Sequence, residues 1–80
     1  MSFQLFEEVA ILVDIPEKKL LKGDVATIVE HHSSKKRESG YSLEVYNAVG
    51  ETIAVLTLPE SCIEPLRETE IFNVRTLSVS

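Results

Sequence analysis

Apolar residues occur along this chain in short runs separated by polar segments, without the sustained 3.6-residue period of an amphipathic helix. The first run is 9–13 (VAILV), and Pro16 and the charged residues after it turn the chain back to the surface. The second run, 25–29 (VATIV), follows a Gly-Asp pair that is typical of a turn. Their short length and branched side chains predict buried strands.

Residues 41–46 alternate between apolar and polar side chains, which is the period of a strand with one buried face. One face of this third strand is expected to carry Tyr41, Leu43 and Val45, and the other face Ser42, Glu44 and Tyr46. A hairpin connection at 47–51 follows, in which Gly50 is free to adopt a positive φ. The run 52–58 (TIAVLTL) then predicts a fourth strand that ends before Pro59.

Residues 60–66 are too few for a stable helix, so we expect one 3₁₀-like turn followed by a brief fifth strand. At the other end, residues 3–8 fit half a helical turn, with Leu5 and Phe6 covering the end of the fold. Five short strands in so small a chain predict an all-β protein, a partly open SH3-like barrel over residues 1–66.

Residues 67–80 form a separate C-terminal extension, in which a polar spacer precedes a run of strand composition at 71–79. A barrel of five strands does not need this run. We expect it to lie either along an edge of its own barrel or along the edge of a neighbouring copy, because an unpaired apolar strand promotes aggregation; disorder is the third alternative. The candidate interaction residues are Ile71, Phe72, Val74, Leu77 and Val79.

Length and charge narrow the functions that the chain can have. Eighty residues form one domain, and a chain of this size buries only about 60% of its unfolded surface, so an oligomeric interface would help stability. The net charge of −5 disfavours nucleic acid and anionic lipid as main partners, because both repel an acidic surface. With no apolar run long enough to span a bilayer and no signal-peptide pattern, the expected location is the cytoplasm.

The side chains that could act in catalysis or bind a metal do not form a recognisable catalytic or metal-binding pattern. His31 and His32 project to opposite faces if the second strand continues through them, so they cannot bind one metal ion together. Cys62 is the single cysteine and is expected to fill the core, not to act as a nucleophile. We therefore expect no enzyme activity, no metal and no cofactor.

Lys35, Lys36 and Arg37 form a basic cluster between serines and Glu38, a composition typical of a solvated loop. They are a weak candidate for nucleic-acid contact, with Tyr41 or Tyr46 as a stacking aromatic.

Three segments carry a resemblance to a known family: DIPE at 14–17, LKGDVATIVE at 21–30 and AVLTLP at 54–59. Over residues 5–66 the chain is similar to small bacterial proteins classed as a domain of unknown function. The resemblance implies an SH3-like barrel and no particular activity. Members of that family usually carry glycine where Ala26 stands, and they usually end before the C-terminal extension. A weaker similarity links KGDVATIVE to ribosomal and transcription-factor barrels that bind RNA.

Together these features predict a non-catalytic protein–protein interaction module, comparable with antitoxins or accessory subunits that act beside a neighbouring protein. Self-association through the C-terminal strand is a further expectation. The alternative is an RNA-binding barrel of the SH3-like type.

Overall fold

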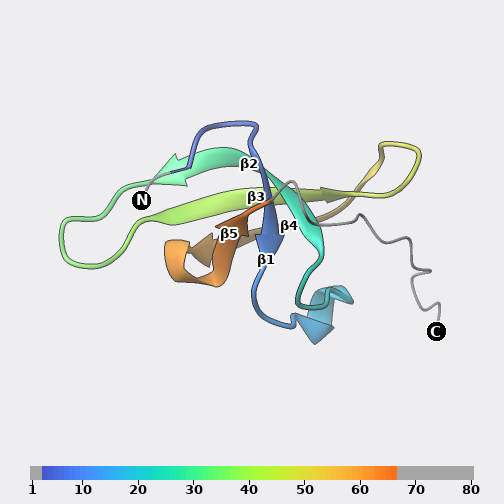
Figure 1. Cartoon of the computed structure of the whole chain (residues 1–80), viewed down its shortest axis with the longest axis horizontal. Coiled ribbons are helices and arrows are strands. Elements are labelled where there is room, and N and C mark those ends of the chain that lie inside the picture. The colour runs from blue at the N-terminus through green and yellow to red at the C-terminus, as the bar shows by residue number, and fades with distance from the viewer. Residues whose placement is uncertain (1–2, 67–80) are drawn as a thin grey trace.

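The computed structural model describes residues 3–66, which form one sheet of five antiparallel strands in the order β4-β3-β2-β1-β5 (Figure 1). The strands are β1 (Glu8–Ile11), β2 (Val25–His32), β3 (Gly40–Tyr46), β4 (Thr52–Pro59) and β5 (Ile63–Pro65). Two 3₁₀ turns interrupt them, η1 (Pro16–Lys18) and η2 (Glu60–Cys62). The prediction of an all-β chain with five strands is confirmed, including the 3₁₀ turn before a brief fifth strand.

One face of the sheet carries the hydrophobic core. Tyr41, Leu43 and Val45 share one face of β3 as predicted, and the structure shows that this face is buried. Leu43 lies opposite Ile28 on one side and Leu56 on the other. Because the described residues contain no α-helix that could cover this face, the sheet must cover it by bending. The core cluster consists of Val9, Ile11, Ile15, Leu20, Ala26, Ile28, Tyr41, Leu43, Val45, Leu56 and Ile63.

The bend is required by the connection between the two outermost strands. In a flat sheet β4 and β5 would lie four strand spacings apart, about 19 Å at roughly 4.8 Å each. The four steps from Pro59 to Ile63 span at most about 14 Å, at roughly 3.5 Å per residue. The register between β2 and β3 shifts between Ile28 and Glu30, and such a bulge sharpens the local bend of a strand. The sheet therefore curls around its own core.

The turn η2 is held in place by the loop between β2 and β3. The Glu38 carboxylate accepts hydrogen bonds from the backbone N–H and the hydroxyl of Ser61, both at 2.9 Å. The backbone N–H of Glu60 also donates to the carbonyl of Ser39 at 2.8 Å. These contacts fix the end of β4 next to the start of β3.

The N-terminal segment differs from the prediction. Leu5 and Phe6 do not cover the core, since their exposed fractions are 54% and 74%. Phe3 covers it instead: its ring meets Tyr41 edge-on at 5.4 Å, and its backbone N–H donates to the Tyr41 hydroxyl at 3.1 Å. Phe6 has a positive φ of 67°, which turns its side chain out as the backbone pairs with Ile28. This segment is therefore a tight turn at residues 5–6 and not the predicted half-turn of helix over residues 3–8.

The hairpin between β3 and β4 forms as expected. Gly50 has a φ of 85°, a conformation that is costly for other residues. The side-chain oxygen of Asn47 accepts hydrogen bonds from the N–H groups of Val49, at 3.1 Å, and Glu51, at 2.9 Å. This turn and the loop between β2 and β3 lie at opposite ends of the molecule (Figure 1).

Two further predictions concern membrane-spanning segments and the C-terminal extension. Between residues 3 and 66, none of the helical segments has the length and apolar character needed to cross a membrane. The expected strand at 71–79, with its candidate residues Ile71, Phe72, Val74, Leu77 and Val79, lies outside the described residues.

Candidate functional site

The two histidines occupy opposite faces of the sheet. In the register of β2 and β3, His31 lies opposite Tyr41, and its ring stacks on the tyrosine ring with a centroid distance of 4.9 Å. His32 lies opposite Gly40 and projects from the other face, where it meets Ser42. The predicted alternation of the two side chains is therefore present, and they cannot share a metal ion.

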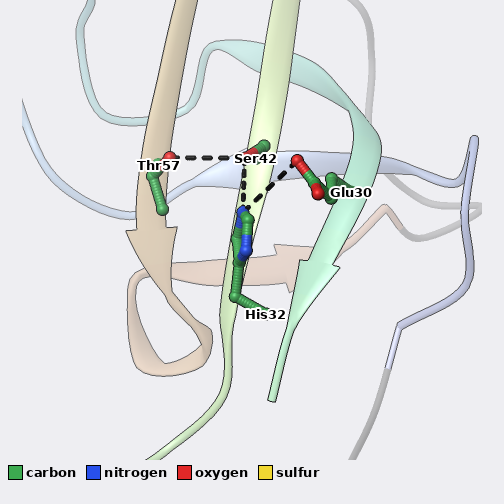
Figure 2. A network of polar contacts seen from close by, with 4 residues as sticks. All are labelled: Glu30, His32, Ser42 and Thr57. Carbon is green, nitrogen blue, oxygen red and sulfur yellow. Dashed lines mark hydrogen bonds and ion pairs between the residues drawn. The ribbon is translucent and has the colours of Figure 1, made fainter. Parts of the chain in front are cut away.

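Four polar side chains from three strands converge on the outer face (Figure 2). Nε2 of His32 lies 2.7 Å from the hydroxyl of Ser42 and 3.7 Å from a carboxylate oxygen of Glu30. The Ser42 hydroxyl also lies 3.3 Å from that of Thr57 on β4. The bulge in β2 creates the cluster, because it sets Glu30 opposite Ser42 and on the same face as His32.

This cluster contains serine, histidine and glutamate but lacks the geometry of a catalytic triad. In a triad the carboxylate binds one imidazole nitrogen while the other accepts the serine proton. Here Glu30 and Ser42 both approach Nε2 of His32. The side chains of His32 and Glu30 are also 45% and 65% exposed, so water screens their attraction. The arrangement is suited to surface hydrogen bonding rather than to proton transfer.

Cys62 does not fill the core, contrary to the sequence prediction. It lies in η2 and is partly exposed, whereas its neighbour Ile63 is buried. The reason is that the chain enters β5 at Ile63, whose side chain points inward, while the Cys62 carbonyl accepts a hydrogen bond from Leu12 at 2.8 Å. Within residues 3–66, no group of three or more potential metal ligands is found.

Within residues 3–66, neither tyrosine offers the basic cluster an accessible ring. Lys35, Lys36 and Arg37 are exposed in the loop between β2 and β3, where the Ser34 hydroxyl accepts hydrogen bonds from two backbone N–H groups at 3.3 Å. Tyr41 is fully buried and cannot stack on a base.

Tyr46 is the more exposed tyrosine, and it lies at the end of β3 that is far from the basic loop. Its hydroxyl donates to Glu44 at 2.8 Å. This hydrogen bond raises the pKa of Tyr46 above its ordinary value, with smaller contributions from desolvation and from the negative charge of Glu44. The aromatic and the basic residues therefore do not form one surface.

The two edges of the sheet differ strongly. β5 has three residues and ends in Pro65, which has no N–H to offer, so it is a poor template for another strand. β4 has eight residues without a charged side chain. Within residues 3–66 its hydrogen-bonded neighbour is β3 alone, so alternate backbone groups along its other side face outward.

Apolar side chains extend to this edge on both faces of β4. On the outer face, Val55 is 54% exposed. On the inner face, Ala54 and Leu58 pack against the core but remain only partly buried, while Leu56 between them is buried. The core thus reaches the edge and stays incompletely covered there. We refer to β4, with these side chains and its outward backbone groups, as the β4 edge.

Comparison with protein families identifies the class of this chain. The chain belongs to the family described as a domain of unknown function (DUF4926), whose model matches residues 5–65. The match therefore spans all five strands. Ala26, at the position where glycine is expected from the resemblance, is buried opposite Val9. Among curated proteins and among solved structures, no significant match is found.

Proposed function

We propose that this protein is a non-catalytic protein–protein interaction module, a partly open SH3-like barrel that binds an extended segment of a partner along the β4 edge. The curled sheet, the bulge in β2 and the short link through η2 support the barrel, because they bring the outermost strands toward each other. The cytoplasm remains the expected location.

The single observation that carries the proposal is that β4 has an unprotected edge within residues 3–66. Proteins normally guard a long sheet edge with charges, proline or a bulge that turns the edge away. β4 has a proline only at its last position, and the register shift of its pairing falls at the hairpin end, between Val45 and Tyr46. The central part, from Ala54 to Leu58, has neither protection.

The chemistry of β4 indicates what the partner segment looks like. Backbone groups along the edge would pair with an extended chain, and this main-chain pairing supplies affinity in β-strand addition. Specificity would come from alternate side chains. Apolar residues on one face of the segment would cover Ala54 and Leu58, and small or apolar residues on the other face would lie beside Val55 and Thr57.

Selection of binding peptides tests the proposal while the partner is still unidentified. The full chain is immobilised and used to select from a phage-displayed library of random peptides. We expect enriched peptides without proline and with alternating apolar residues. Val55→Lys should weaken their binding by roughly tenfold or more, because a lysine guards the edge against an added strand.

Val49→Lys is the matched control, because Val49 is 79% exposed but lies in the hairpin turn outside β4. It should leave peptide binding unchanged. Two results would overturn the proposal: equal binding of the enriched peptides to the Val55→Lys and wild-type chains, or no enrichment of any peptide by a chain that size-exclusion chromatography shows to be monomeric. Circular dichroism of both variants verifies that they are folded.

RNA binding, the alternative prediction, has weaker support. The loop with Lys35, Lys36 and Arg37 carries positive charge, but Tyr41 is buried and Tyr46 is distant, so neither predicted stacking tyrosine is available beside it. Loss of single-stranded RNA binding when all three basic residues are replaced by alanine would favour this alternative.

A further inference from the structure

We propose that the occupant of the β4 edge is residues 71–79 of a second copy of the same chain, paired antiparallel to β4. This inference rests on the proposed function and names the partner. If two chains exchanged these segments, each would cover the other's edge, and the interface would have two-fold symmetry. A domain of 80 residues has the most to gain from such an interface, because it buries a small share of its surface alone.

The length and composition of the C-terminal segment match the edge. Residues 71–79 (IFNVRTLSV) number nine and contain neither glycine nor proline, and β4 has eight residues. Arg75 is the one charged residue in the segment and lies at its centre. The spacer 67–70 (RETE) is polar, as expected for a connection that crosses solvent between two domains.

The side chains select one register. In an antiparallel pairing that sets Arg75 beside Val55, Phe72 lies beside Leu58 and Val74 beside Leu56. Both apolar side chains then face the incompletely covered part of the core, where Leu58 is only partly buried. Thr76 faces the inner side in either direction, but a parallel pairing centred on the same residue would set Ser78 beside Leu58 in place of Phe72, which would leave the serine hydroxyl without a partner there.

The same register suits the outer face. Glu44 lies opposite Val55 on β3, so Arg75 on an added strand would be two strand spacings away, roughly 10 Å between backbones. The long arginine side chain can extend over the exposed methyl groups of Val55 and place its charge near Glu44. Asn73 in this register lies beside Thr57, so polar groups neighbour each other.

A second copy is favoured by where the described chain ends. Residue 66 follows β5, at the opposite end of the strand order from β4. β5 runs in the same sense as β4, because four antiparallel pairings separate them. A segment that paired antiparallel with β4 of its own chain would have to reverse direction within the four-residue spacer, which contains no glycine, proline or asparagine to favour a tight turn. Pairing with a second copy requires only an extended spacer.

Disulfide trapping between two differently tagged full-length chains tests the proposal. Both chains carry Cys62→Ser to remove the native thiol. One carries Val55→Cys and the other Arg75→Cys, because directly opposed residues of an antiparallel pair have a Cβ spacing that a disulfide can bridge. After mixing and mild oxidation, we expect a product that contains both tags and has twice the mass of the 8.9 kDa chain.

Two controls make the result specific. Val49→Cys in place of Val55→Cys should give little mixed product, since it lies outside β4. Thr76→Cys in place of Arg75→Cys should also give little, because its side chain faces the other side of the proposed strand. Equal trapping in all combinations would show random collision and would overturn the inference.

A doubly substituted chain, with Val55→Cys and Arg75→Cys together, separates the remaining outcomes. If its disulfide forms within one chain, the segment occupies its own edge and the second copy is excluded. If no disulfide forms in any arrangement while selected peptides still bind in a Val55-dependent way, the interaction module stands and its partner is a different protein. Peptide binding that ignores Val55 would remove the proposed function itself.

Discussion

Replacement of Leu43 by alanine should be strongly destabilising, because Leu43 is the central contact of the core. Leu43 is fully buried on β3 and lies between Ile28 and Leu56 on the neighbouring strands. Leucine-to-alanine changes at such sites cost about 3 kcal/mol or more, from lost transfer free energy and the cavity that remains. Domains have about 0.05–0.15 kcal/mol of stability per residue, hence roughly 4–12 kcal/mol for this chain.

Urea unfolding followed by circular dichroism measures this loss. For a small domain the dependence of the unfolding free energy on urea is about 1 kcal/mol per molar, so a loss of about 3 kcal/mol should lower the midpoint by roughly 3 M. The matched change Val49→Ala, at an exposed position in the hairpin turn, should alter the unfolding free energy by less than about 0.5 kcal/mol. A loss below about 1 kcal/mol for Leu43→Ala would refute the placement of the core.

Three further predictions test local features. Gly50→Ala should cost about 1 kcal/mol in thermal or urea unfolding because φ is 85°, whereas Gly40→Ala should be nearly neutral, since a Cβ there meets only ordinary contacts. Tyr41→Phe should cost about 1 kcal/mol in the same assay, because the hydroxyl accepts a hydrogen bond from the N-terminal segment. In Glu44→Gln, NMR titration should show the pKa of Tyr46 moving down toward 10.0. Because the folded-state pKa is raised, this group's contribution to stability is complete below about pH 10 and is lost at higher pH.

The strands themselves were predictable from the sequence, because branched apolar runs and turn residues specify them locally. Alternation placed Tyr41, Leu43 and Val45 on one face of β3, and the structure adds that this face is buried. The bulge after Ile28 was not predictable from the residues of β2 alone, because it depends on how β2 pairs with β3. Because the bulge contributes to the bend of the sheet, the degree of bending could not be predicted from the sequence either.

Errors arose where the chain changes direction. Phe6 was expected to cover the core, but a positive φ turns it into solvent and Phe3 takes that place. Cys62 was expected in the core, but it is the last residue of η2, and β5 begins at the next residue, Ile63. In both cases a shift of one or a few residues exchanges the inward and outward side chains, and local composition does not fix such a shift.

The polar cluster on the outer face shows a similar limit. His32 was considered only as a metal ligand and was rejected as one. Ser42 and Thr57 were not considered, because only the registers of three strands bring them to His32. The β4 edge was also not predictable, since composition does not reveal which strand is outermost. Once the strand order is known, the absence of charge along β4 becomes informative.

Amide hydrogen exchange of the full chain, measured by NMR with and without the strongest selected peptide, tests the central claim most directly. If the peptide adds a strand to the β4 edge, alternate backbone N–H groups of β4 should exchange at least about tenfold more slowly, while those of the 47–51 turn should not change. Protection confined to the loop with Lys35, Lys36 and Arg37, or no change along β4, would contradict the account.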